Sequence, residues 1–157
     1  MPEETPVVIV SACLLGVTCN HHGGSSPSAA VAELASGHRL IPVCPEVAGG
    51  LATPRPAAEK GPDGRVRTAD GADVTDLYER GAAHTVALAK ATKAVGAVLK
   101  ARSPSCGCHE IYDGTHTRVL VPGVGVTAAA LREAEVPVCS EEDLLGPGPL
   151  AWSAPGA

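Results

Sequence analysis

The sequence predicts an α/β fold, a Rossmann-like three-layer sandwich with a mainly parallel sheet of four to five strands. Short apolar runs rich in β-branched residues alternate with stretches of helical spacing, which is typical of a parallel sheet with helices on both faces. Loops rich in glycine and proline follow the predicted strands. Hydrophobic residues make up 45% of the chain but aromatic ones only 2%, so the core must consist mainly of Ala, Val, Leu and Ile.

The first predicted unit is a strand, a helix and a second strand. Residues 7–12 form an apolar, β-branched run that indicates a buried strand. Ser26 and Pro27 resemble an N-cap followed by proline at the first helical position, and Gly37 is placed to end that helix. Residues 39–43 then predict the second strand, which completes a βαβ unit.

The segment 44–72 is rich in proline and glycine and has no helical period. Within it, Pro62-Asp63-Gly64 is a strong turn signal. We therefore expect a small hairpin over 59–67 and no helix in this part of the chain.

A long helix over 73–94 is predicted next, with Asp73 as a possible cap and Gly81 as a weak point. A third strand over 95–100 follows it. The next residues, 102–108, contain too much Ser, Pro and Gly for regular structure.

The last third of the chain predicts three further elements. They are a short extra strand at 117–121, a helix over 126–135 capped by Thr127 or a neighbour, and a fourth strand over 136–139. We interpret residues 1–145 as a single domain and residues 146–157, which are rich in proline and glycine, as a flexible tail.

Charge and composition exclude several functions. The formal net charge is −5 and no basic run occurs, so binding to a nucleic-acid polymer is not expected. The chain lacks a signal-peptide pattern and an apolar stretch of membrane-spanning length, so we expect a cytoplasmic protein without a membrane partner, a monomer or small homo-oligomer. Six cysteines in a reducing compartment favour metal binding or catalysis over disulfides.

Three cysteines follow predicted strands. Cys13 comes after the first strand, Cys44 after the second, and Cys106 lies in the loop after the third. Ligands of open α/β sheets bind outside the carboxyl ends of the strands, so these thiols are expected to converge. Three thiolates suit zinc or an iron–sulfur cluster and leave one coordination position open, whereas the alternative is three buried core thiols. Cys139 also ends a strand, where a core position is favoured over a fourth ligand.

Three motifs carry a family resemblance that runs from about residue 7 to residue 144. The motifs are Ser11-Ala-Cys-Leu-Leu-Gly16, Cys44-Pro-Glu-Val-Ala-Gly-Gly-Leu51 with Pro54-Arg-Pro56, and Ser103-Pro-Ser-Cys-Gly107. Together they resemble the thiouracil desulfidase family, formerly a domain of unknown function. The resemblance implies a [4Fe–4S] cluster held by Cys13, Cys44 and Cys106. It also implies non-redox removal of sulfur from a small thiolated pyrimidine, such as thiouracil or 4-thiouridine monophosphate, with release of hydrosulfide.

The resemblance also implies catalytic roles for Glu46 and Ser103 as proton-handling residues. Each has a plainer interpretation, since Glu46 could form an ion pair with Arg55 and Ser103 could cap the turn before Pro104. Arg55 and Ser105 are candidates for substrate binding: Arg55 could hold a phosphate or carboxylate, and Ser105 could equally bond a cluster sulfur.

One loop departs from the family pattern. Many members have Cys-Arg-Tyr-Asp-Gly where this chain has Cys19-Asn-His-His-Gly23. His22, with His21, is therefore a candidate for substrate binding and for a changed substrate, although both are also ordinary surface residues. The roles of Cys19 and Cys108 stay open. A non-catalytic iron–sulfur sensor and a zinc protein are the alternative functions.

Overall fold

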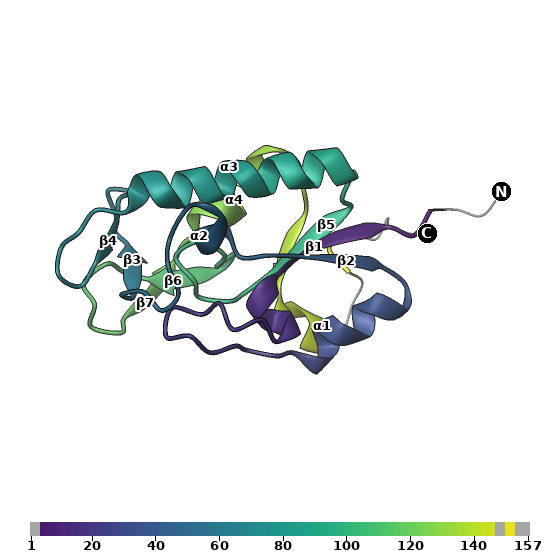
Figure 1. Cartoon of the computed structure of the whole chain (residues 1–157), viewed down its shortest axis with the longest axis horizontal. Helices are drawn as coiled ribbons and strands as arrows, with labels where there is room; N and C mark the ends of the chain where they lie inside the picture. Colours follow the sequence, from purple (N-terminus) through teal and green to yellow (C-terminus); the bar gives the residue numbers. More distant parts are fainter. Residues whose placement is uncertain (1–3, 147–149, 153–157) are drawn as a thin grey trace.

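The computed structural model describes residues 4–146 and 150–152 and has a four-stranded sheet at its centre (Figure 1). The strand order is β2-β1-β5-β8, and each neighbouring pair is parallel, as predicted. These strands are β1 (Val7–Ser11), β2 (Arg39–Val43), β5 (Gly96–Leu99) and β8 (Val138–Ser140). The α/β prediction is confirmed.

Strand β1 shows why the strands of the sheet correspond to continuous apolar runs in the sequence. Val8, Ile9 and Val10 are all fully buried. Ile9 packs into the core on one face of the sheet, whereas Val8 and Val10 pack into the core on the other. A strand with both faces covered has no polar positions to alternate with, which is typical of parallel sheets.

Helices cover both faces of the sheet (Figure 1). On one face, α3 (Thr75–Thr92) packs against α4 (Val126–Glu133). On the other face lie α1 (Ala29–Glu33) and the 3₁₀ turn η1 (Ala12–Leu15). Within the described ranges, no helix is both long enough and apolar enough to cross a membrane.

The first predicted helix starts later than expected, whereas α4 starts at Val126 as predicted. The first helix begins after Ser28, whose side chain accepts a hydrogen bond from the backbone N–H of Val31. Ser26 instead holds the preceding loop, because its N–H donates to the carbonyl oxygen of Cys13. In α4 the N-cap is Gly125, and Thr127 is a fully buried residue of the first turn.

The chain beyond the carboxyl ends of the sheet holds more regular structure than predicted. The hairpin of β3 (Ala58–Lys60) and β4 (Val66–Thr68) is present as expected. The expected single strand at 117–121 is one half of a second hairpin, formed by β6 (Glu110–Tyr112) and β7 (Leu120–Pro122). Together, the two hairpins lie over one end of the central sheet (Figure 1).

A one-turn helix, α2 (Pro45–Ala48), occurs where no helix was predicted, and it packs against α3. Gly81 of α3 permits the contact, because a Cβ built there would lie 1.9 Å from the carbonyl oxygen of Pro45. Glycine at this position is therefore a requirement of packing rather than a defect of the helix. The contact fixes α2 directly after Cys44.

We expect Gly81→Ala to lower the free energy of unfolding by roughly 1–3 kcal/mol or more, because the added methyl group overpacks a backbone contact. Denaturation in urea measures the change. Gly37→Ala is the matched control, since a Cβ at Gly37 meets no atom within 4 Å. Equal stability of the two variants would contradict this account of the α2–α3 contact.

The predicted flexible tail over 146–157 lies partly outside the described residues, as do residues 1–3 of the predicted domain over 1–145. Of the residues described, Trp152 is docked rather than loose. Its Nε1 donates a hydrogen bond of 3.1 Å to Nε2 of His38, and its ring packs against the core on the α1 face. Gly96 provides the space, because a Cβ there would lie 2.2 Å from the indole ring.

Candidate active site

A cavity of about 560 Å³ opens at the carboxyl ends of β1, β2 and β5. Its walls come from the segments that follow these strands and from the two small hairpins. Four of the six cysteines line it, namely Cys13, Cys19, Cys44 and Cys106. Parallel strands deliver their loops to one edge, so the position agrees with the general rule for open α/β sheets.

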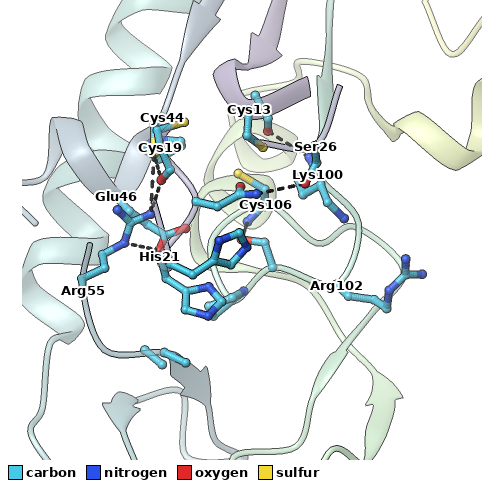
Figure 2. A pocket seen from close by; sticks show the side chains of 18 of the residues that line it. Cys13, Cys19, His21, Ser26, Cys44, Glu46, Arg55, Lys100, Arg102 and Cys106 are labelled. Atoms are coloured by element: carbon cyan, nitrogen blue, oxygen red, sulfur yellow. Dashed lines mark hydrogen bonds and ion pairs between the residues drawn. The ribbon is translucent and has the colours of Figure 1, made fainter. Parts of the chain in front are cut away.

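Cys13, Cys44 and Cys106 meet because of the strand order. Strand β1 lies between β2 and β5, so the segments that carry these three residues are neighbours. Figure 2 shows their sulfur atoms turned toward a common space. Cys13 lies in η1, Cys44 follows β2 directly, and Cys106 lies in the loop after β5.

Two of the three thiols, those of Cys13 and Cys106, have raised pKa values and so do not resemble free reactive thiols. Burial raises the pKa of Cys13 to about 11, and the nearby Cys44 raises it further while Lys100 opposes the shift. Burial likewise raises the pKa of Cys106 to about 12, against a hydrogen bond from Ser11. Free thiols of this kind stay protonated at neutral pH, but a bound metal takes them as thiolates. A set of three sulfur donors fits a thiolate-bound metal or cluster and leaves room for a further ligand.

The other cysteines lie in three different settings. Cys139 is buried in the core on the α1 face and does not line the cavity, which agrees with the favoured core position. Cys108 also lies outside the cavity lining. Cys19 lines the cavity beside Cys44, and its pKa rises to about 12 through burial and the closeness of Cys44 and Cys13. If a fourth thiol approaches the metal, Cys19 is therefore better placed than Cys139.

Glu46 lines the cavity two residues after Cys44 and is held from two sides. Its Oε2 accepts a hydrogen bond of 2.9 Å from the hydroxyl of Tyr78 and one of 3.2 Å from Nε of Arg55. The Glu46 side chain is only 14% exposed. Burial and two donors on Oε2 fix the carboxylate, and both of these hydrogen bonds leave Oε1 unused.

Arg55 is almost fully buried, and its guanidinium is occupied by the protein. Besides Glu46, it donates to the carbonyl oxygens of Cys19 and Ala52 and to the hydroxyl of Thr53. One nitrogen also lies 3.9 Å from Sγ of Cys44. These contacts join the loops around the cavity (Figure 2) and favour a positioning role over the predicted role in substrate binding.

The hydrogen bond from Tyr78 predicts a loss of stability on its removal. Tyr78→Phe leaves the buried Glu46 carboxylate with one donor fewer, and hydrogen bonds to charged groups are worth about 1.5–3 kcal/mol. Anaerobic denaturation should show a decrease of that size in the free energy of unfolding. Tyr112→Phe, the matched control on the cavity wall, should change it by less than about 0.5 kcal/mol. Equal losses of stability in the two variants would contradict a stabilising Tyr78–Glu46 hydrogen bond.

The two serines of the Ser-Pro-Ser-Cys motif separate. Ser103 lines the cavity, and its Oγ accepts hydrogen bonds from the backbone N–H groups of Ser105 (3.1 Å) and Cys106 (3.0 Å). This is the predicted turn cap, and the hydroxyl proton stays available to another acceptor. Ser105 is fully buried against Thr127, at 2.8 Å between their hydroxyls, and lies outside the cavity lining. The structure therefore does not bring Ser105 to a substrate.

The loop that departs from the family pattern reaches the cavity. His21 and His22 both line it, at the rim and largely exposed. The carbonyl oxygen of His21 accepts a hydrogen bond from the N–H of Arg55, at 2.7 Å. Nδ1 of His22 accepts one from the N–H of Gly24, at 3.1 Å.

Sequence reasoning did not identify several residues of the site, among them Ser11, Lys100 and Tyr78. Ser11 ends β1, lines the cavity and hydrogen-bonds Cys106, as a polar residue at the end of an apolar strand could have indicated. Lys100 directly follows β5, lines the cavity and forms an ion pair of 3.2 Å with Glu141. Tyr78 lies within α3, and nothing in its local sequence points to Glu46.

The fold and the site together define a parallel α/β domain whose cavity for a small molecule is lined by four cysteines. The chain belongs to the 2-thiouracil desulfurase family, whose model matches residues 8–143.

Two relatives resemble the chain over most of its length. The protein YbbK of Bacillus subtilis (strain 168) is 41% identical over 147 residues, which are 88% of this chain and 97% of YbbK. A solved structure of the [4Fe-4S]-dependent thiouracil desulfidase TudS is 42% identical with a TM-score of 0.84, covering 89% of this chain and 93% of TudS. The family resemblance predicted from the three motifs is confirmed.

Proposed function

We propose that this protein is an iron–sulfur enzyme that removes sulfur from a thiolated pyrimidine base or nucleotide. The main observation is that three cysteines that follow three strands share one cavity with Glu46; Cys13 and Cys106 are buried and Cys44 is half-buried. Family membership and the likeness to TudS support a [4Fe–4S] cluster bound by Cys13, Cys44 and Cys106. With three protein ligands, such a cluster keeps one iron open to polarise the sulfur of a substrate.

The overall reaction replaces a carbon–sulfur double bond by a carbon–oxygen double bond. Water supplies the oxygen, its two protons leave with the sulfur as hydrogen sulfide or as hydrosulfide and a free proton, and no electrons are transferred. A group that takes a proton from water as it attacks, and returns it later, would accelerate this exchange.

Glu46 is the residue best placed for this proton transfer. Tyr78 and Arg55 fix its carboxylate through Oε2, so Oε1 is the oxygen that would take the proton from water. Ser103 has accepted two backbone N–H groups, so its own proton can be donated to the substrate. These two side chains and the three thiols line the same cavity.

Turnover without redox reagents tests the proposal. The protein is reconstituted anaerobically with iron and sulfide, desalted and incubated with 2-thiouracil, 4-thiouracil or 4-thiouridine monophosphate. We expect equal amounts of sulfide and desulfurised product from at least one of them, with no added reductant. A cluster-loaded protein that releases no sulfide from any of the three would favour the sensor function instead.

The cations of the cavity favour a nucleotide among these substrates. Arg55, Lys100 and Arg102 line it but are engaged in ion pairs with protein carboxylates. Within residues 4–146 and 150–152, Arg118 is a cavity cation with no ion pair at all, and it is exposed. A phosphate group is a natural partner for such a side chain.

We expect Arg118→Gln to raise KM for 4-thiouridine monophosphate by roughly tenfold, because one charge-assisted hydrogen bond to phosphate is lost. KM for 4-thiouracil, which has no phosphate, should stay within twofold. Steady-state kinetics with both substrates on one preparation makes the comparison. A parallel change for the two substrates would contradict a phosphate contact.

A further inference from the structure

A second group of metal-ligating side chains lies outside the cavity. The Sγ of Cys108, a ring nitrogen of His109 and a carboxylate oxygen of Asp143 all lie within 4.8 Å of one another. None of the three residues lines the cavity that holds Cys106. The group is therefore separate from the proposed cluster site, although Cys106 and Cys108 share a loop.

The protein holds these side chains in place through other contacts. Asp143 caps η3 (Glu141–Leu145), because its Oδ2 accepts a hydrogen bond of 2.7 Å from the N–H of Ser140. The backbone of Cys108 is fixed by Arg132, which donates to its carbonyl oxygen at 2.9 Å. Nε2 of His109 lies 2.8 Å and 3.0 Å from the two oxygens of Asp143. The ligand atoms are thus gathered without a metal.

The spacing is close to that of a tetrahedral zinc site. With Zn–S of about 2.3 Å and Zn–N or Zn–O of about 2.0–2.1 Å, ligand atoms stand roughly 3.3–3.7 Å apart. The His109–Asp143 pair needs to open by about half an ångström, and Cys108 needs to approach by at most about 1.3 Å. Side-chain rotations of this size leave the backbone where it is.

The environment suits a divalent cation that enters from solvent. Cys108 is 3% exposed and forms the floor, whereas the side chains of His109 and Asp143 are 59% and 38% exposed and form the opening. One thiolate, one carboxylate and one neutral imidazole balance two positive charges. The sulfur and nitrogen donors favour zinc over magnesium or calcium, which prefer oxygen.

We propose that Cys108, His109 and Asp143 bind one zinc ion, with water as the fourth ligand. The ion joins the loop that carries Cys106 to η3, whereas the two are otherwise joined through side chains such as Arg102, which pairs with Glu142 at 2.8 Å. Zinc that binds the folded chain alone stabilises it according to its concentration and affinity. The proposal does not depend on the proposed desulfidase function.

Metal analysis of the cluster-loaded protein tests the proposal. The protein is reconstituted anaerobically, freed of loose metal with a weak chelator and dialysed against zinc, and zinc and iron are counted per chain. We expect one zinc beside an undiminished cluster. Cys108→Ser and His109→Gln should each weaken zinc binding at least tenfold. His84→Gln, an exposed histidine on α3, is the matched control and should bind zinc as the wild type does.

Cobalt gives a second readout that does not depend on counting. Co²⁺ in this site should show a thiolate-to-metal charge-transfer band in wild type and in His84→Gln, and none in Cys108→Ser. His109→Gln changes an exposed side chain and leaves the core intact, so it remains informative if Cys108→Ser fails to fold. Zinc content equal in wild type and both ligand variants, or no zinc above background in wild type, would overturn the proposal.

Discussion

Replacing Cys13, Cys44 or Cys106 by alanine is expected to abolish both cluster binding and sulfide release. Each residue would supply one of three thiolates, and two are too few to hold the cluster in the cavity. Iron and acid-labile sulfide per chain, measured after anaerobic reconstitution, should fall to the level of unreconstituted protein. Turnover of 4-thiouracil should fall below detection in the same samples.

Cys139→Ala is the matched control for this series. Cys139 is buried in β8, and its side chain packs in the core away from the cavity. We expect a modest loss of stability, full iron content and sulfide release close to that of the wild type. A Cys139→Ala protein without a cluster, or a Cys44→Ala protein with one, would contradict the assigned ligands.

Replacing Glu46 by glutamine is expected to lower kcat for sulfide release by roughly 10²–10⁴-fold, the usual contribution of a general acid or base. The amide keeps the size of the side chain and can still accept from Tyr78, but it cannot take a proton from water. Cluster content should be unchanged, which separates this variant from the cysteine series. Single-turnover kinetics on preparations with equal iron content measures the effect.

Glu79→Gln is the control for Glu46→Gln. Glu79 follows Tyr78 on α3 but is exposed, and it does not line the cavity. Its replacement should leave the rate within twofold of wild type. A Glu46→Gln rate within tenfold of wild type would contradict a role of Glu46 in proton transfer. Glu46 would then be only an ion-pair partner of Arg55.

The fold can be predicted from the sequence because the apolar runs and the positions of the cysteines after them both agree with the final packing. The apolar runs at Val8–Val10 and around Val98 are buried from both sides. A continuous apolar run in the sequence therefore corresponds directly to a strand of the sheet. The position of three cysteines after three such strands follows from the fold alone, since parallel strands end at one edge.

The rest of the site depends on contacts between distant residues. Tyr78 reaches Glu46 because Gly81 lets α3 approach α2, and neither fact is visible within a short window of sequence. Ser105 sits in a motif beside Cys106, yet it points into the core toward Thr127. Adjacency to Cys106 does not place Ser105 in the cavity, because in an irregular loop neighbouring side chains face different directions.

Helix boundaries were misplaced for a related reason. Ser26 and Pro27 have the right residue types for a helix start, but the N–H of Ser26 donates to the carbonyl oxygen of Cys13. A tertiary contact at the cavity thus outweighed a local capping preference, and the helix begins after Ser28. The same competition between local and tertiary contacts explains the one-turn helix α2, which proline and glycine content alone argued against.

The central claim is that three cysteines hold a cluster whose remaining iron is open to substrate beside Glu46. Mössbauer spectroscopy of protein reconstituted with ⁵⁷Fe, recorded with and without 4-thiouracil, tests it most directly. We predict that one iron in four differs from the others and that its signal alone changes when the substrate is added. Four equivalent irons that do not respond to the substrate would show a closed cluster and contradict the account.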